Sequence, residues 1–345
     1  MVSRPAILFF IILLTAVTAP QAKDFNDGDV AHIVYPDWLK KDFLDLEDYL
    51  SEARSRDKHG LMVLFTTEGC SYCDAFIKRS LGNPELVSTV RKNFDSVGLE
   101  IFDDAEMTDA HGEILRVKQF AKREGAEFAP TLTFYGDGGE RVLRVVGYQS
   151  PERFGMILDY VSGGYFRTES LRDYLKRTVV KPASPQLGGA ARLKDDPLFT
   201  TPPYALDRRR FPASRPLLVI FEEVACDECA QFHEAVLSLP EVRELLKGFE
   251  IVRLDAADAN TPVLAPDGSR VTPAAWFQNT DFTRVPALLF FDKKGNEVLK
   301  TDALVLRQRM MNSLLFVLER AYEKGWTYQR LARSKGIERN RNNPQ

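Results

Sequence analysis

The residues best suited to chemistry in this sequence are four cysteines in two Cys-x-x-Cys pairs, Cys70 with Cys73 and Cys226 with Cys229. The chain has no other cysteine, so the sequence holds no separate disulfide framework. Cysteines at this spacing bind zinc, close a structural disulfide or exchange electrons through sulfur. The elements around each pair help to distinguish these three uses.

Each pair follows a short apolar run and precedes a helical pattern. The first cysteine therefore lies where a helix begins, and the free N–H groups and the helix dipole at that point favour its thiolate form. The second cysteine comes one turn later on nearly the same face of the helix. We expect Cys70 and Cys226 to attack a disulfide, and Cys73 and Cys229 to resolve the mixed disulfide that forms.

An internal duplication relates the two pairs. Residues 156 positions apart match along the chain: Val63 and Val219, Phe65 and Phe221, Cys70 and Cys226, Cys73 and Cys229, Phe76 and Phe232, Leu81 and Leu237, Pro84 and Pro240, Pro130 and Pro286, Phe134 and Phe290, Gly139 and Gly295. A period of this length corresponds to a domain rather than to a solenoid repeat. The sequence therefore predicts two related domains.

The same order of elements is predicted in each half, and a proline starts the second helix of each. A strand leads into the cysteine pair, two helical stretches and a strand follow, and a hairpin and a last helix close the unit. The predicted strands are 61–65, 99–102 and 131–135 in the first half and 217–221, 250–254 and 287–291 in the second, and the last helices are 151–161 and 304–324. This pattern predicts an α/β fold with a central mixed sheet flanked by helices in each half.

With these features the sequence resembles the thioredoxin superfamily. The matching residues are Cys70-Ser71-Tyr72-Cys73 and Cys226-Asp227-Glu228-Cys229, each with a proline 60 residues after its first cysteine, Pro130 and Pro286. The resemblance covers about 61–161 and 217–325. It implies that both prolines follow cis peptide bonds beside the disulfides. It also implies that the backbone of Ala129 and Val285 pairs with an extended partner, as an added strand would.

Both halves differ from cytosolic thioredoxin at a position that the resemblance marks as functional. A buried carboxylate is expected six residues before the first cysteine, where this chain has Leu64 and Ile220. An internal proton acceptor is thereby lost. Glu222 and Glu223 are alternative acceptors in the second half, although residues at such positions more often cap a helix or face solvent. We expect His233 to be a partly exposed helical residue.

The residues between the cysteines predict that the two pairs differ in redox potential. Ser71 and Tyr72 are uncharged, whereas Asp227 and Glu228 place two carboxylates beside Cys226. An anion at ~4 Å disfavours a thiolate by about 1 kcal/mol in water and by up to ~4 kcal/mol at an effective dielectric constant of 20. Since about 1.4 kcal/mol corresponds to ~30 mV for a two-electron couple, we expect the second pair to be more reducing by tens of millivolts.

The terminal segments and the linker of the chain predict export and two domains. Residues 1–22 have a positive start, an apolar stretch and small residues, which is typical of a secretory signal peptide; an uncleaved membrane tether is the alternative. The mature protein would work in the periplasm or another exported, disulfide-permissive compartment. We predict a first domain at 23–180, a Pro- and Gly-rich linker at 181–216, a second domain at 217–333 and a frayed polar tail at 334–345.

The predicted function is thiol–disulfide exchange with partner proteins. The formal charge of −3 does not indicate the basic surface that nucleic-acid binding requires. A shared zinc site is disfavoured because 152 residues separate Cys73 from Cys226. No metal or organic cofactor is needed, so electrons would come from another redox protein such as a membrane thiol reductase. The resemblance favours reduction of partner disulfides and includes exported proteins associated with bacterial sulfur oxidation. A redox-inert docking module with structural disulfides is the alternative.

Overall fold

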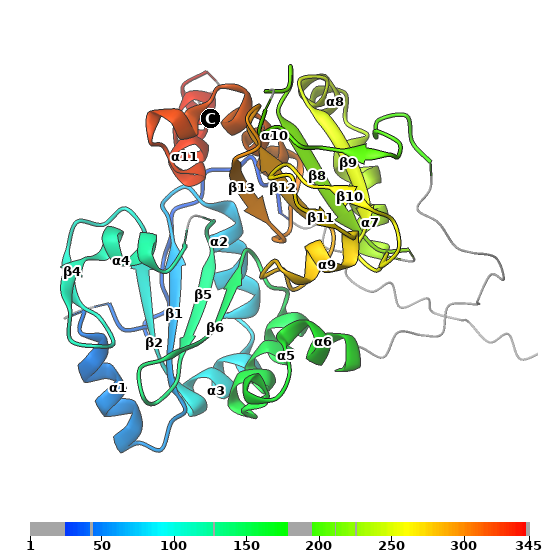
Figure 1. Cartoon of the computed structure of the whole chain (residues 1–345). Helices are drawn as coiled ribbons and strands as arrows, with labels where there is room; N and C mark the ends of the chain where they lie inside the picture. Colours follow the sequence, from blue (N-terminus) through cyan, green and yellow to red (C-terminus); the bar gives the residue numbers. More distant parts are fainter. Residues whose placement is uncertain are drawn as a thin grey trace, which may run out of the picture.

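The computed structural model describes residues 25–41, 44–126, 128–178, 195–210, 212–224 and 226–342. It contains two α/β domains that lie against each other, the first running from blue to green in Figure 1 and the second from yellow-green to red. Each domain has a four-stranded mixed sheet with helices on both faces, as predicted. The signal peptide predicted at 1–22 lies outside the described residues.

In the first domain the sheet has the strand order β2-β1-β5-β6. The neighbour β2 is parallel to β1, while β5 is antiparallel to both β1 and β6. Seven buried residues form β1, and alternate side chains enter the two hydrophobic cores on the two faces of the sheet. The strands are β1 (Gly60–Thr66), β2 (Phe94–Glu100), β5 (Thr131–Tyr135), β6 (Arg141–Val146) and an outlying pair, β3 (Glu106–Thr108) with β4 (Ile114–Arg116).

The helices of this domain begin where the sequence supplies caps. Asn83 accepts hydrogen bonds from the N–H groups of Glu85 and Leu86, and Pro84 is the first residue of its helix, as predicted. The helices are α1 (Leu46–Ser55), α2 (Ser71–Ala75), which continues as a π-helix (Phe76–Ser80), α3 (Pro84–Asn93), α4 (Val117–Arg123), α5 (Pro151–Ser162), a 3-10 turn (Tyr165–Arg167) and α6 (Leu171–Thr178).

The second domain repeats this plan with matching strand registers. Its sheet has the order β9-β8-β12-β13, and Phe221 pairs with Ala287 as Phe65 pairs with Thr131 in the first domain. The strands are β8 (Leu217–Glu222), β9 (Glu250–Asp255), β12 (Ala287–Phe291), β13 (Glu297–Thr301) and an outlying sheet of β7 (Tyr204–Ala205), β10 (Val263–Leu264) and β11 (Arg270–Val271). The helices are α7 (Asp227–Phe232), which continues as a π-helix (His233–Leu237), α8 (Pro240–Leu246), α9 (Pro273–Gln278), α10 (Arg307–Leu318), a 3-10 turn (Ala321–Lys324) and α11 (Tyr328–Asn342).

Two boundaries differ from the predictions inside the domains. The strand predicted at 99–102 is β2, which starts at Phe94, and a turn occupies residues 101–102. The single helix predicted at 304–324 is α10 and a separate 3-10 turn, because the backbone turns left-handed at Arg320 (φ 53°). The first difference comes from the pairing of β2 with β1, which begins at Phe94 and Gly60, and the second from the local backbone at Arg320; apolar periodicity encodes neither.

The tail and the linker also differ from the predictions. Residues 334–342 are helical rather than frayed, since α11 continues to Asn342 and is held at both ends. Leu331 is buried near its start, and the Arg339 side chain donates to the Gly28 carbonyl (3.3 Å). The predicted linker 181–216 lies partly outside the described residues. From Asp195 on its described part contacts the second domain, where β7 pairs with β10 and Arg208 binds Glu250 (2.6 Å).

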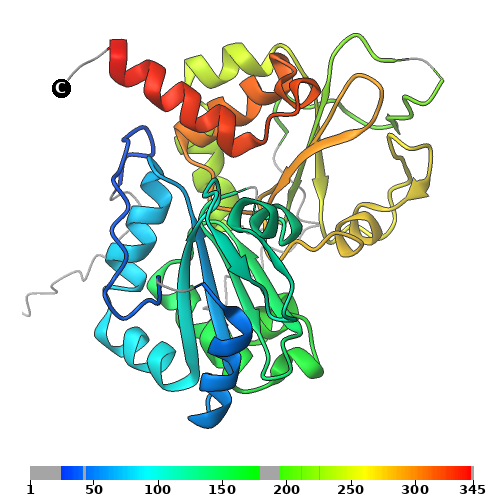
Figure 2. The same ribbon diagram turned by 90° about the vertical axis from the view of Figure 1, so that its left-hand side faces the viewer.

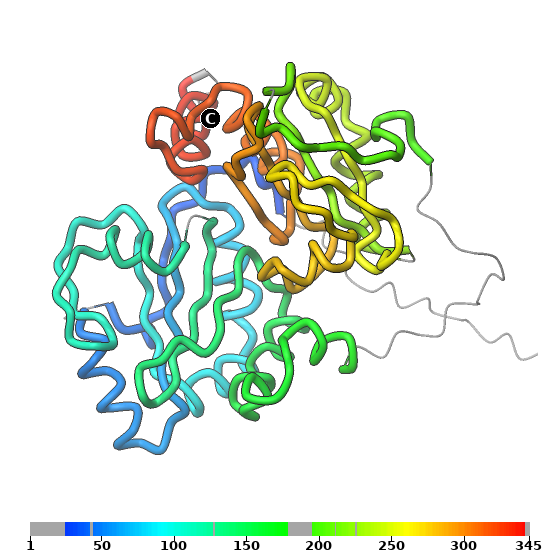
Figure 3. Tube along the Cα trace, viewed as in Figure 1, coloured from blue at the N-terminus to red at the C-terminus, as the bar shows by residue number. Residues whose placement is uncertain are grey.

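The interface between the domains has an approximate two-fold relation. The helices α5 and α10 are equivalent in the duplication, and the turns that precede them meet: an added Cβ at Gly147 would lie 2.3 Å from the Cβ of Ala303, its counterpart 156 positions on. Repeated surfaces that meet their own equivalents are typical of isologous dimers. Phe128 of the first domain belongs to a hydrophobic core of the second. Figure 3 follows the chain through both domains and across this interface.

We predict that Gly147→Ala destabilises the closed pair of domains. Gly147 has φ +83°, and a side chain there would overlap Ala303. Backbone strain of about 1 kcal/mol and overpacking of about 1–3 kcal/mol should lower the free energy of unfolding by roughly 2–4 kcal/mol. Urea unfolding with both disulfides intact measures this change.

The matched control for this prediction is the double variant Gly147→Ala/Ala303→Gly. Removal of the Ala303 methyl relieves the overlap but not the backbone strain, so part of the lost stability should return in a double-mutant cycle. If the two substitutions add without any coupling, the close contact between the two turns is not the cause.

Candidate functional site

The first cysteine pair forms a disulfide at the start of α2. Cys70 is the N-cap residue, and its Sγ accepts a hydrogen bond from the N–H of Cys73 (3.1 Å). The disulfide joins Cys70 to Cys73 within the motif, with 5.3 Å between the Cα atoms. Cys70 is 7% exposed and Cys73 is fully buried. The sulfur expected to react is therefore the one nearer the surface, although little of it is open.

The second pair has the same local geometry but is more open. Cys226 is the N-cap of α7, and its Sγ accepts from the N–H of Cys229 (3.0 Å). These two residues are also joined in a disulfide. Cys229 is buried, whereas Cys226 is partly exposed. An external partner thus finds more of the second sulfur pair at the surface than of the first.

Both prolines expected beside the disulfides follow cis peptide bonds, Ala129–Pro130 and Val285–Pro286, as the resemblance implies. In the first domain the Sγ of Cys70 lies 3.7 Å from the carbonyl oxygen of Ala129. The structure therefore brings Cys70, Cys73, Ala129 and Pro130 together. In the second domain β12 pairs with β8 in the same register as β5 pairs with β1. Pro286 therefore lies at the same position relative to β8, the strand before Cys226, as Pro130 does relative to β1.

The residues near the second pair include a buried carboxylate, Glu222, which the sequence offered as an alternative proton acceptor. Glu222 neither caps a helix nor faces solvent: it is 2% exposed, and its Oε1 lies 2.7 Å from Nε2 of His233. Of the two interpretations of Glu222, a helix cap or solvent-facing residue is therefore wrong and a buried acceptor fits, because the end of β8 lies inside the domain. His233 is helical and partly exposed, as predicted. Glu223 pairs with Lys176 of the first domain (3.0 Å). Leu64 and Ile220 are fully buried core residues.

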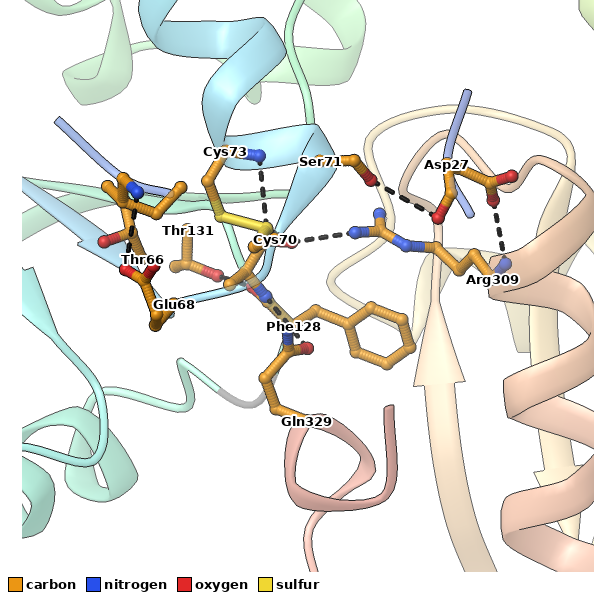
Figure 4. Close-up of a disulfide and its surroundings, with 12 residues drawn as sticks. Asp27, Thr66, Glu68, Cys70, Ser71, Cys73, Phe128, Thr131, Arg309 and Gln329 are labelled. Carbon is orange, nitrogen blue, oxygen red and sulfur yellow. Dashed lines mark hydrogen bonds between the residues drawn. A yellow bond between two sulfur atoms is a disulfide. The ribbon is translucent and has the colours of Figure 1, made fainter. Parts of the chain in front are cut away.

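Arg309 brings the second domain into the first site. Its Nη2 donates to the carbonyl of Ala129 (2.8 Å), and its guanidinium carbon lies 3.4 Å from the centroid of the Tyr72 ring. The Ala129 oxygen thus has both Cys70 and Arg309 as neighbours. Figure 4 shows the Arg309 side chain pointing toward Cys70. A cation from another domain is in this way held next to the disulfide and the cis proline.

Asp27 fixes Arg309 in this position from the other end of the chain. Its carboxylate accepts from the N–H groups of Gln308 (3.0 Å) and Arg309 (2.8 Å), which start α10 and have no side-chain cap of their own. The hydroxyl of Tyr72 donates to the same carboxylate (2.9 Å) and accepts from the N–H of Leu306 (2.9 Å). Burial raises the pKa of Tyr72 well above its usual value, so the phenol stays protonated as a donor.

Helix α11 covers the same edge of the first domain. Figure 2 shows α11, in red, extending from the second domain across the end of the first. The ring of Tyr328 stacks on Phe128 with 4.2 Å between centroids and 7° between planes. Beside it, the Oε1 of Gln329 accepts from the N–H of Ala129 at 3.5 Å, a long hydrogen bond. The second domain thus contacts both backbone polar groups of the residue before the cis proline.

Sequence reasoning did not identify Arg309, Asp27 or Gln329. The duplication could have indicated Arg309, since it corresponds to Arg153 and both are the third residue of their helix. Arg153 also crosses the interface, where its Nη2 donates to the hydroxyl of Thr283 (3.0 Å). Its burial lowers its pKa to about 10, so it stays charged at neutral pH. Asp27 and Gln329 lie outside the duplicated core, and no pattern marked them.

The chain is similar to one protein family and to several solved structures. The thioredoxin-like domain family matches the chain at residues 46–162 and 212–317, which together make up more than half of it. A thioredoxin-fold protein from Helicobacter pylori is 22% identical with a TM-score of 0.32, over 35% of this chain and 80% of its own. A thioredoxin from Thermus thermophilus is 22% identical with a TM-score of 0.28, over 36% and 87%. A DsbH oxidoreductase is 10% identical with a TM-score of 0.29, over 42% and 95%.

No curated protein sequence matches the chain. The two family matches coincide with the two halves of the duplication, and each holds a mixed sheet, a Cys-x-x-Cys disulfide at a helix start and a cis proline. The chain belongs to the thioredoxin-like domain family and carries two copies of that domain in tandem.

Proposed function

We propose that this protein is an exported thiol–disulfide oxidoreductase that reduces disulfides in partner proteins. The observation that carries the proposal is the placement of Cys70 and Cys226, each at the first turn of a helix, where its sulfur accepts a backbone N–H bond. A thiolate formed by reduction at such a position is stabilised by the N–H groups and by the helix dipole. The family fold supports this chemistry in both domains.

The reaction proceeds in two exchange steps. The thiolate of Cys70 or Cys226 attacks one sulfur of the partner disulfide, and the other partner sulfur leaves as a thiolate. The second cysteine of the motif then attacks the mixed disulfide, releases the reduced partner and closes the disulfide seen in the structure. Two electrons pass to the partner, so another redox protein, such as a membrane thiol reductase, must supply two electrons for each cycle.

Export and compartment rest on the sequence. The segment 1–22 supports a signal peptide, and a periplasmic or other exported location suits a protein whose cysteines all lie in disulfides. Among the described residues, no helix is both long and apolar enough to cross a bilayer. A docking role without redox turnover is the second candidate for the first domain, and the low exposure of Cys70 favours it there.

The single variants Cys73→Ser and Cys229→Ser should trap partner proteins as mixed disulfides, because each leaves an attacking thiol without its resolving cysteine. We expect Cys229→Ser to capture more than Cys73→Ser, since Cys226 is partly exposed and Cys70 is 7% exposed. Non-reducing gels and mass spectrometry of exported proteins measure the capture. The control is Cys226→Ser/Cys229→Ser, which has no attacking thiol in the second domain. Absence of capture in both variants, with no insulin reduction by the reduced wild type, would favour the docking role.

Asp227→Asn/Glu228→Gln should raise the redox potential of the second pair. The two carboxylates disfavour the thiolate and thereby the reduced state, so their removal makes the pair easier to reduce. Both residues are exposed and solvent screens them, which limits the expected rise to roughly 10–30 mV. Equilibration with glutathione, read for each pair by mass spectrometry, measures the shift. The Cys70–Cys73 pair of the same molecule is the control, and an equal shift in both pairs would contradict the electrostatic explanation.

A further inference from the structure

We propose that Arg309 and Gln329 set the specificity of the first site: they close its edge to extended polypeptides and leave it open to small thiols. The proposal rests on the proposed function, since it concerns which molecules exchange with Cys70. It assigns to the second domain a role in the chemistry of the first.

The closed edge is the backbone of Ala129. An extended partner that adds as a strand needs the N–H and the C=O of this residue. Gln329 accepts from the N–H (3.5 Å), and Arg309 donates to the C=O (2.8 Å). The second domain therefore occupies the hydrogen-bonding groups that a polypeptide partner would use.

The two side chains are held firmly in this position. Arg309 is 3% exposed and Gln329 is 6% exposed. Arg309 lies over the Tyr72 ring, while its backbone N–H binds Asp27. Gln329 follows Tyr328, whose ring stacks on Phe128 next to the cis-proline bond. A polypeptide must displace these buried contacts before it can pair with Ala129, which slows its reaction.

The second site lacks an equivalent closure. Arg153, the counterpart of Arg309, donates to the side chains of Thr283 (3.0 Å) and Gln149 (2.9 Å) rather than to a backbone carbonyl. In the part of the chain that the structure describes, no hydrogen bond to the backbone of Val285 is found. The second site therefore provides an internal reference in the same molecule, with the same motif and an open edge.

A small molecule has a route to Cys70 that does not involve the Ala129 backbone. Cys70 lines a cavity of about 190 Å³, whose other lining residues include Glu68, Tyr72, Arg309, Tyr328 and Gln329. A thiolate that enters it can attack the Sγ of Cys70, and Cys73 leaves as a thiolate. The second thiol of a small dithiol then attacks the mixed disulfide, so that the reductant is oxidised to a disulfide and the Cys70–Cys73 pair gains two electrons.

The test compares two reductants on the intact oxidised protein: dithiothreitol and an extended peptide with two cysteines. Quenched alkylation and mass spectrometry give the rate of reduction for each cysteine pair separately. In the wild type, we expect the ratio of the peptide rate to the dithiothreitol rate to be roughly ten-fold lower at the first pair than at the second. Gln329→Ala should raise the peptide rate at the first pair by roughly five-fold, the value of one hydrogen bond, and leave the dithiothreitol rate within about two-fold.

Arg309→Lys gives a second variant, because lysine keeps the charge but loses the planar contact with Tyr72 and should also accelerate the peptide. Arg330→Ala is the matched control: it lies beside Gln329 on α11 with an exposed side chain, and it should change neither rate. If Arg309→Lys unfolds, as circular dichroism would show, the Gln329 variant still decides.

The outcomes separate this inference from the proposed function. Equal rate ratios at the two pairs of the wild type overturn the inference and leave the proposed function standing. An equal gain for both reductants in Gln329→Ala also overturns it, since that result means general opening rather than specificity. If neither reductant reduces either pair in any variant, the proposed function itself fails.

Discussion

The rest of the structure depends on the contact between two equivalent turns, one after the last strand of each sheet. The absence of a side chain at Gly147 lets the turns approach, and the equivalent helices α5 and α10 begin shortly after these turns, beside the interface. Arg153 and Arg309 occupy the same helical position and cross the interface in opposite directions. A tandem duplication can thus pack with equivalent turns facing each other, as in an isologous dimer, although the two equivalent arginines have different partners.

The symmetry is broken by the ends of the chain. Asp27 comes from the segment before the first domain, and α11 from the segment after the last equivalent helix. Both act on the first site. The same duplicated motif therefore exists in one molecule in two environments: Cys70 is surrounded by three segments of the chain, and Cys226 remains partly open. Duplication supplied two copies of the chemistry, and the added ends made their surroundings different.

The sequence predicted the fold within each domain well, because that fold depends on local and repeated features. Apolar runs placed β1, β5, β8 and β12, and prolines marked the first residues of α3 and α8. The site itself came from cysteine spacing and from the family resemblance. The errors have a common cause: Phe94 starts its strand early, Ser334 lies in a stable helix and Glu222 is buried because of tertiary contacts, which outweigh local composition. Arg309 and Gln329 lie 180 and 200 residues from Ala129, and no local pattern encodes contacts at that separation.

The order of synthesis has a consequence for the Ala129 edge, because the helices that cover it are made after the sheet. A chain emerges from its N-terminus, and domains generally fold as they appear. All residues of the first sheet precede residue 147, whereas the two side chains that cover Ala129 belong to α10 and α11, which come much later in the chain. Until α10 and α11 have been made, the backbone N–H and C=O of Ala129 in the first domain have no partner from these helices. Unpaired backbone groups of this kind let an exposed sheet edge pair with another chain. The finished protein would then owe the closure of this edge to helices that are made well after the sheet that they cover.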